Sequence, residues 1–323
     1  MRLKRRSHRT QSFSFLLNDK ELCILCERRV RRYLPSYFCQ KVELLTDKTE
    51  LLEKSLSLPK LPNPARRIIM TQHRVYHSFL EAKQQGLKRL AVLIDPDKMR
   101  LGNVGRVIEL AARGGADYFF VGGSLIVNDM MDYCLDAIRE VGGIPSVLFP
   151  GSPQQINDKA DAILFLSLIS GRNADFLIGQ HVLAAPMLRR SSLEIIPTGY
   201  MLIDGGAPTT ATYISGTLPI PSNKEDIALC TAMAGEMLGL KTIYLDAGSG
   251  AKIPVNETMI RAVSRGIAAP LIVGGGMRTP EKVAANAEAG ADIIVVGNAF
   301  EKDPELILEM AHAVHSVEQR IEV

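Results

Sequence analysis

The stretch LIVGGGMRTPEKVAANAEAGADIIVVGNAF, residues 271–300, decides the fold of this chain. Its short apolar runs at residues 271–273 and 292–296 predict two buried strands, because each run is bounded by glycine. Thr279 supplies an N-cap for a helix between the strands, and Gly290 ends that helix. A strand, a helix and a second strand in this order indicate a parallel β/α architecture.

The glycines that follow the two strands indicate a phosphate site. Residues 274–276 are all glycine, and Gly297 with Asn298 follows the second strand. Glycine lets backbone N–H groups approach a ligand closely, and in (β/α)8 barrels the loops after strands seven and eight frequently bind phosphate. The alternative is that both loops are only tight turns. Two such loops on adjacent strands favour phosphate over that alternative.

Eight predicted strands alternate with helices, which indicates an α/β protein with a (β/α)8 TIM barrel. The predicted strands are residues 90–94, 117–121, 146–149, 162–168, 194–203, 242–245, 271–273 and 292–296. The interval 150–161 between the third and fourth strands is too short for a full crossover helix. We therefore expect a modified barrel in which one outer helix is missing.

The first 69 residues differ in composition from the rest. They hold 16 Lys and Arg against 7 Asp and Glu and none of the 26 glycines, whereas the remaining residues hold 22 basic against 28 acidic residues. We expect a barrel domain over residues 70–323 and a basic extension over residues 1–69. The extension is either sequence upstream of a natural start at Met70 or a disordered tail, with a nucleic-acid-binding arm as a further alternative. The acidic larger part predicts no nucleic-acid partner.

The cysteines and the apolar runs bear on cellular context. Cys23 and Cys26 have a C-x-x-C spacing, yet no second pair follows at a zinc-like distance. The total of 5 cysteines fits a reducing compartment. No stretch reaches the roughly 18 apolar residues that a membrane span requires. We expect a cytoplasmic protein without a membrane span.

Polar residues at the predicted C-terminal ends of strands are the candidates for chemistry. Asp95 follows the first strand and suits Mg²⁺, which prefers one or two carboxylates with phosphate oxygens and water; the alternative is a cap for a helix near residue 101. Ser124 either binds the same metal or turns the chain. Asp246 follows the sixth strand, and its alternative role is an Asx-turn. His181 lies in an apolar helix, which favours packing over catalysis.

With these motifs in place, the chain resembles the geranylgeranylglyceryl phosphate synthase family, prenyltransferases that include the bacterial heptaprenylglyceryl phosphate synthases. The resemblance covers about residues 75–318. The matching motifs are LIDPDK at 93–98, FVGGS at 120–124, TGYMLIDGG at 198–206, IYLDAGSG at 243–250, VGGGM at 273–277 and VVGNA at 295–299. Two departures, Leu93 where many members have Lys and Asp246 where Glu is common, indicate a distinct, Bacteroidetes-like branch.

The resemblance implies specific roles for residues of this chain. Asp95 and Ser124 would bind Mg²⁺, and Asp246 with Tyr244 would be catalytic. The residues implied to hold sn-glycerol 1-phosphate are Tyr244, Leu245, Asp246, Ala247, Gly248, Ser249, Gly250, Gly275, Gly276, Gly297 and Asn298. The family also lacks the third outer helix. Asp246 could orient the acceptor hydroxyl, accept its proton or stabilise a cation, and the sequence does not choose among these roles.

The expected activity is transfer of a polyprenyl group, geranylgeranyl above all, from its diphosphate to the C3 hydroxyl of sn-glycerol 1-phosphate, in ether-lipid biosynthesis. A second reading is a phosphate-binding barrel isomerase of amino-acid biosynthesis, which needs no Mg²⁺. A third is a non-catalytic barrel that binds a phosphorylated metabolite or a flavin. The expected partners are the two substrates and further copies of the chain, in a dimer or hexamer. The lipid product further suggests transient membrane contact.

Overall fold

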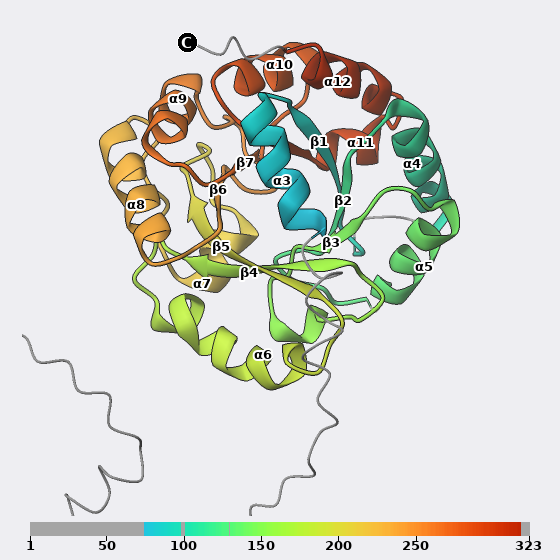
Figure 1. Ribbon diagram of the computed structural model, residues 1–323, viewed down its shortest axis with the longest axis horizontal. Coiled ribbons are helices and arrows are strands. Elements are labelled where there is room, and N and C mark those ends of the chain that lie inside the picture. The colour runs from blue at the N-terminus through green and yellow to red at the C-terminus, as the bar shows by residue number, and fades with distance from the viewer. Residues whose placement is uncertain (1–73, 98–100, 129, 318–323) are drawn as a thin grey trace, which may run out of the picture. The chain divides into compact units, whose positions relative to one another are not determined.

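Eight parallel strands form a closed barrel in chain order, with β1 paired to β8 (Figure 1). The computed structural model describes residues 74–97, 101–128 and 130–317. The strands are β1 (Arg89–Ile94), β2 (Tyr118–Val121), β3 (Ser146–Leu148), β4 (Ala162–Leu168), β5 (Glu194–Leu202), β6 (Thr242–Asp246), β7 (Leu271–Gly274) and β8 (Ile293–Val296). The predicted (β/α)8 barrel is therefore confirmed.

Helices surround the barrel in the ring that Figure 1 shows. They are α4 (Leu101–Gly114), α5 (Met131–Val141), α6 (Gln180–Leu188), α8 (Glu225–Met237), α9 (Glu257–Gly266), α10 (Pro280–Glu288) and α12 (Leu306–His315), with the shorter α7 (Thr210–Ser215) and α11 (Asn298–Lys302). In residues 149–161, all of which the structure describes, the only helical turn is η2 (Pro153–Gln155). The prediction of a missing outer helix between β3 and β4 is confirmed.

The capping signal at Thr279 acts as the sequence indicates, whereas two other elements differ from the expectation. The side chain of Thr279 accepts a hydrogen bond from the backbone N–H of Lys282 and caps α10. The apolar helix that contains His181 begins as the π-helix η3 (Asp175–Gly179), which runs directly into α6. The residues after β8 form the short helix α11 rather than a loop, with Gly297 at its N-cap position.

Two apolar layers stabilise the barrel, one inside the strands and one between strands and helices. Side chains alternate between them along each strand. In β2, Tyr118 and Phe120 pack in the barrel interior, whereas Phe119 and Val121 pack against the helices. Every residue of β2, β6, β7 and β8 is buried, as expected for parallel strands covered on both faces.

The helix α3 (Arg74–Gln85) closes the N-terminal end of the barrel and crosses in front of the strands in Figure 1. Its buried residues Val75 and Phe79 join the interior apolar layer. The ring of Phe79 meets that of Tyr118 edge to face, with centroids 4.9 Å apart. The carboxylate of Glu194, the first residue of β5, accepts a hydrogen bond of 2.9 Å from the backbone N–H of Val75.

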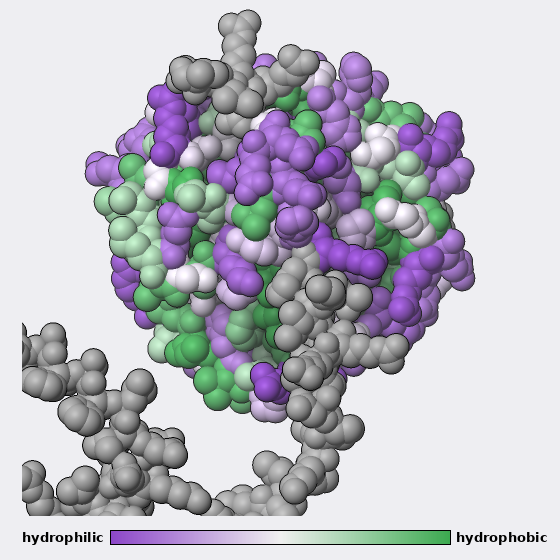
Figure 2. Space-filling view, viewed as in Figure 1, coloured by the Kyte–Doolittle hydropathy of each residue, from purple (hydrophilic) through white to green (hydrophobic). Residues whose placement is uncertain are grey.

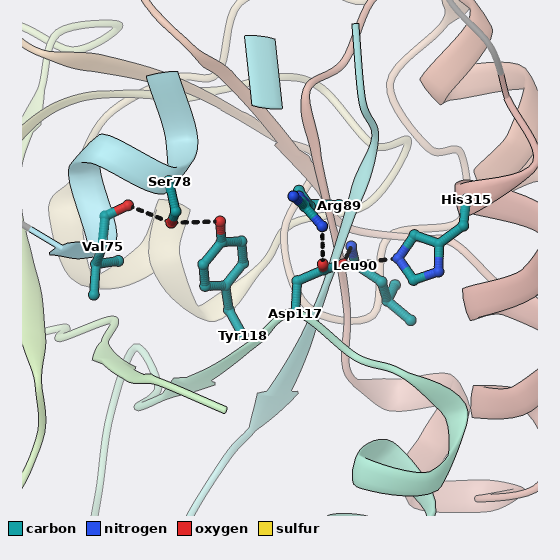
Figure 3. Close-up of polar contacts among 7 residues, drawn as sticks. All are labelled: Val75, Ser78, Arg89, Leu90, Asp117, Tyr118 and His315. Atoms are coloured by element: carbon teal, nitrogen blue, oxygen red, sulfur yellow. Dashed lines mark hydrogen bonds and ion pairs between the residues drawn. The ribbon is translucent and has the colours of Figure 1, made fainter. Parts of the chain in front are cut away.

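Polar contacts fasten the same end of the barrel (Figure 3). Ser78 Oγ on α3 lies 2.8 Å from Tyr118 Oη on β2. Asp117 joins three elements, because its carboxylate accepts hydrogen bonds from Arg89 Nη1 at 2.7 Å and from the backbone N–H of Leu90 at 2.8 Å, and lies 2.8 Å from His315 Nε2 on α12. These contacts tie β1, β2 and α12 together at the end opposite to the predicted site.

We expect the chain from Met70 onward to keep its fold and activity, and the chain from Gly86 onward to lose stability. The described residues fall in one compact unit, Ile69–Val323, while the expectations for residues 1–69 concern residues that the structure does not describe. Removing α3 uncovers the interior layer, and loss of a buried Phe alone typically costs about 3–5 kcal/mol. Thermal unfolding and activity of both truncated chains measure this. Unfolding of the longer one would place residues 1–69 in the domain.

Candidate active site

A cavity of about 240 Å³ lies at the C-terminal ends of the strands and collects most of the predicted residues. Those that line it are Asp95, Ser124, Tyr244, Asp246, Gly248, Ser249, Gly250, Gly275, Gly276, Gly297 and Asn298. Leu245 and Ala247 are not part of the lining; both are buried in the layer between strands and helices. The alternation of side chains along β6 explains this, because Tyr244 and Asp246 point inward when Leu245 points outward.

Asp246 at the end of β6 is held from two sides. Its Oδ2 accepts a hydrogen bond of 2.6 Å from Tyr200 Oη, and its Oδ1 accepts one of 2.7 Å from the backbone N–H of Gly248. The second bond is the Asx-turn foreseen as an alternative, so the turn coexists with a carboxylate in the cavity wall. Asp246 is only 7% exposed. Burial raises the pKa of its carboxyl, and the bonds from Tyr200 and Gly248 oppose this shift.

The loops after β6 and β7 and the start of α11 after β8 converge at the mouth of the cavity. Gly275 has a φ of +87°, and a Cβ there would lie 2.6 Å from the backbone nitrogen of Gly248 and 2.7 Å from Asp246 Oδ1. Glycine is therefore required for the close approach of these two loops. Ser249 Oγ donates a hydrogen bond of 3.2 Å to Asn298 Oδ1, which links the loop after β6 to the start of α11.

The end of β8 has the strand, glycine and short helix that frequently form a phosphate site in such barrels. Gly297 ends the strand and Asn298 begins α11. A Cβ on Gly297 would meet the side chain of Leu93 at 3.2 Å. Leu93, which also lines the cavity, thus occupies the space beside this glycine. A larger side chain at position 297 would have to displace it.

Asp95 and Ser124 lie on the same wall of the cavity, at the ends of β1 and β2. A Cβ on Gly123 would lie 3.0 Å from Asp95 Oδ1, so the glycine leaves room for the carboxylate beside the GGS loop. Asp95 Oδ1 also accepts a hydrogen bond of 3.1 Å from the backbone N–H of Asp97. This turn ends before α4 begins at Leu101, so Asp95 does not occupy the N-cap position of that helix.

The oxygen atoms on this wall fit Mg²⁺. One carboxylate and one hydroxyl are hard oxygen donors, and Mg²⁺ usually completes its six ligands with water and substrate phosphate oxygens. Within residues 74–97, 101–128 and 130–317, no group of three or more His, Cys, Asp or Glu side chains is placed to hold a metal. The donor set therefore suits an ion bound together with a phosphorylated substrate, rather than one enclosed by protein ligands alone.

The cavity continues as an apolar branch beside β4. Its lining there includes Ile156, Ile163, Phe165, Phe176, His181, Ala184 and Leu188. The branch lies beside β4, between η2 and the segment formed by η3 and α6, in the region where the outer helix is missing. His181 packs edge to face on Phe165, with ring centroids 4.4 Å apart, and burial lowers its pKa. Its packing role is thus combined with a place in the cavity wall.

The sequence did not single out two residues of the mouth, Tyr200 and Phe149. Their rings and that of Tyr244 form a cluster with centroid distances of 5.0–5.8 Å, Phe149 stacked on Tyr244 and Tyr200 edge-on to both. Tyr200 pairs in register with Tyr244 on the neighbouring strand. Its position in the TGYM motif near the end of a strand is the only sequence signal for this role. Burial raises the pKa of Tyr200, so it is a hydrogen-bond donor at neutral pH.

Replacing Tyr200 with Phe should lower kcat by ~10- to 100-fold and shift the pH profile, if Asp246 acts as a carboxylate base. The lost hydroxyl lowers the pKa of Asp246 in the wild-type protein, so its removal raises that pKa further. The acidic limb of kcat/KM then moves to higher pH. Initial rates between pH 5 and 9 measure the shift, with Tyr213→Phe, at an exposed position, as control. An acidic limb at the wild-type pH would show that Tyr200 does not affect the protonation of Asp246.

The fold and the cavity at the C-terminal ends of its strands define a TIM-barrel protein of the enzymatic kind. The chain belongs to the PcrB family, whose model matches residues 84–315.

The chain aligns with nearly the whole length of its relatives in this family. This chain is 55% identical over 244 residues to the geranylgeranylglyceryl phosphate synthase of Chitinophaga pinensis, and the alignment covers 76% of this chain and 97% of the relative. The enzyme of that name from Flavobacterium johnsoniae is 45% identical over 238 residues, covering 74% and 97%. A crystal structure of (S)-3-O-geranylgeranylglyceryl phosphate synthase from Thermoplasma acidophilum, in complex with its substrate sn-glycerol-1-phosphate, has a TM-score of 0.71 at 34% identity and covers 75% of this chain and 99% of that one.

Proposed function

We propose that this chain transfers a geranylgeranyl group from geranylgeranyl diphosphate to the C3 hydroxyl of sn-glycerol 1-phosphate, giving geranylgeranylglyceryl phosphate and diphosphate. The observation that carries the proposal is one cavity that joins a glycine-lined polar mouth to an apolar branch. This combination suits a small phosphorylated acceptor and a hydrocarbon donor. The names of the relatives and the substrate in the Thermoplasma structure support the same reaction.

The phosphate of the acceptor is assigned to the loops after β6, β7 and β8. Backbone N–H groups in glycine loops and at the start of a short helix suit a phosphate. Gly276 and Gly297 line this part of the cavity, and the linked side chains of Ser249 and Asn298 add polar atoms. With the phosphate there, the glycerol hydroxyls extend toward Asp246, which lies at the end of β6.

The diphosphate of the donor is assigned to the wall formed by Asp95 and Ser124, the residues that would hold Mg²⁺. When bound, the ion neutralises charge that develops on the leaving diphosphate. Asp95 contributes one negative charge to this wall, and Ser124 contributes an uncharged oxygen. Leu93 and Phe149 continue the lining with apolar atoms.

In the proposed reaction, the bond between the allylic carbon and the diphosphate oxygen breaks, and the diphosphate leaves with the electron pair. The C3 oxygen of the acceptor forms the new ether bond, and its proton passes to the carboxylate of Asp246. The raised pKa makes this carboxylate a stronger base than an exposed Asp. The π faces of Phe149, Tyr200 and Tyr244 favour a cation-like carbon beside them.

The apolar branch is assigned to the prenyl chain. Phe165, Phe176 and Leu188 are among its lining residues, and no charged side chain of the described residues lines the part beside β4.

No helix in the described part of the chain has the length and apolar character to cross a membrane. A cytoplasmic location, assembly into a dimer or hexamer, and a dispensable segment 1–69 stay predictions.

Incubation of the protein with sn-glycerol 1-phosphate and prenyl diphosphates of graded length, followed by mass analysis, tests the proposal. We expect an ether product of the C20 donor, formed only with Mg²⁺, and no product from sn-glycerol 3-phosphate. A barrel isomerase would convert a phosphorylated sugar without Mg²⁺. A flavin-binding protein would purify with colour. Absence of product from every donor under these conditions would overturn the proposal.

A further inference from the structure

The segment 205–223, between β5 and α8, exposes apolar side chains and contains no charged residue. Tyr213 is 86% and Leu218 is 87% exposed. Single exposed apolar residues are common on proteins and carry little meaning. In this segment the exposed apolar residues lie on anchored backbone and beside the cavity.

Several contacts anchor the segment to the rest of the barrel. Thr209 and Thr212 form a reciprocal capping box at the start of α7, and Gly216 ends that helix with a φ of +59°. Asn173 Nδ2 donates a hydrogen bond of 2.6 Å to the carbonyl oxygen of Ser215. Further along, Ile220 is buried and forms an isolated bridge with Ile203. Tyr213 and Leu218 are therefore presented to solvent by an anchored scaffold.

The exposed residues flank the apolar branch of the cavity. The barrel order places β3 and β4, which border this branch, between β2 and β5. The loop after β5 carries Tyr213 and Leu218, and the loop after β2 carries the exposed Leu125 and Val127. Leu125 and Ile214 line the cavity itself, so the apolar lining reaches the exposed rim on both sides.

The opposite end of the barrel has a different surface. Figure 2 looks onto the end closed by α3, where hydrophilic residues dominate the centre of the view. Exposed apolar side chains also occur elsewhere, so position beside the cavity, and not exposure alone, distinguishes the residues discussed here. We call Leu125, Val127, Tyr213 and Leu218 the apolar rim.

We propose that the apolar rim docks on the surface of a lipid bilayer, with Tyr213 and Leu218 entering the interfacial region. This proposal rests on the proposed function, because a prenyl donor and a lipid product both reside in membranes. Tyr is favoured at membrane interfaces, and segment 205–223 has no charged group to desolvate. Docking places the apolar branch beside the bilayer, so that the donor enters and the product leaves without crossing water.

Binding of the full chain to phosphatidylcholine vesicles, without substrates, tests the docking surface. Uncharged vesicles are chosen because the basic residues 1–69 would attract anionic lipid. We expect Tyr213→Ser with Leu218→Ser to lower the partition coefficient by at least about tenfold, since two apolar side chains are lost from the interface. We also expect wild-type binding to persist at high salt.

A matched control is available at the end of α8, where Met237 and Leu238 are 79% and 80% exposed. These residues precede β6 and thus lie toward the N-terminal end of the barrel. Met237→Ser with Leu238→Ser should bind vesicles like the wild type. Both double variants should turn over a donor dispersed in detergent at the wild-type rate, and this assay tests the proposed function separately from docking.

Several results would overturn the docking proposal. They are absence of wild-type binding to the vesicles, unchanged binding by the rim variant, and loss of binding in the control pair. Loss of binding through Val182→Ser with Leu183→Ser would assign docking to the exposed face of α6 instead. Conversion of an oligomer to a monomer by the rim variant, seen by light scattering, would make the rim an interface between copies of the chain.

Discussion

Replacing Asp246 with Asn is expected to lower kcat by about three orders of magnitude, within the range for loss of a general base. The fold should be unharmed. Asn keeps an oxygen that can accept the hydrogen bond from the Gly248 N–H, and it fills nearly the same volume. Single-turnover rates at saturating substrates measure the loss.

The same substitution has an expected effect on stability with a defined sign. Burial raises the pKa of Asp246 in the folded chain above its unfolded value, so the carboxyl stabilises the fold only at low pH, and this contribution is lost as pH rises through the folded pKa. Above the folded pKa the wild type carries a buried charge that Asn lacks. Asp246→Asn should be within about 1 kcal/mol of the wild type or more stable at pH 7, and relatively less stable at lower pH. Urea unfolding at two pH values measures this.

Asp204 provides a matched control for this prediction. It follows the neighbouring strand β5, which ends at Leu202, and accepts a hydrogen bond of 2.9 Å from the backbone N–H of Gly206, in the same kind of turn. It is exposed and is not among the residues that line the cavity. Asp204→Asn should keep the wild-type rate. Comparable rates for both variants would show that Asp246 acts only through its turn.

Replacing Asp95 with Asn should abolish Mg²⁺-dependent prenyl transfer while glycerol phosphate binding stays within about threefold of the wild type. The carboxylate lies at the end of β1, whereas the segments proposed to bind the phosphate follow β6, β7 and β8. Loss of a charged contact to the proposed metal would remove several kcal/mol of stabilisation of the leaving group, and each ~1.4 kcal/mol is a factor of ten in rate. Mg²⁺ titrations of the rate and calorimetric titration of glycerol 1-phosphate separate the two effects.

Asp97 is the control for Asp95. Two residues away, it carries the same charge, but its carboxylate accepts hydrogen bonds of 2.6 and 2.7 Å from the backbone N–H groups of Val127 and Asn128. Asp97→Asn should leave the Mg²⁺ concentration for half-maximal rate unchanged. Wild-type turnover by Asp95→Asn at saturating Mg²⁺ would reduce Asp95 to its local turn and remove it from the metal site.

The sequence predicted the elements of the barrel because the signals for them are local. The apolar run at residues 162–168 coincides with β4, and Thr279 caps α10 as its position before Pro280 indicated. The short interval between β3 and β4 correctly predicted the missing helix, since a crossover helix requires a minimum length. The C-terminal ends of parallel strands lie at the same end of a barrel. Residues predicted to follow the strands were therefore expected together, and most of them line one cavity.

The remaining features depend on contacts between distant segments. The bond between Tyr200 and Asp246 follows from the register of β5 and β6, which no local pattern specifies. The contact of Gly297 with Leu93 depends on closure of the barrel between β8 and β1. Leu245 points outward because its neighbour Asp246 points into the cavity. A sequence motif lists consecutive residues without this alternation, so it included Leu245 among the binding residues.

The missing helix beside β4 has a thermodynamic consequence. In a complete barrel, a permanent outer helix covers each strand, and that coverage is part of the folding free energy. If the prenyl chain binds in the apolar branch as proposed, it supplies part of this coverage, so occupancy and stability become linked quantities. A ligand at one hundred times its Kd adds about 2.7 kcal/mol to the free energy of unfolding. On this proposal the bound substrate would act as a transient part of the outer layer, and each product release would return the barrel to its less stable form.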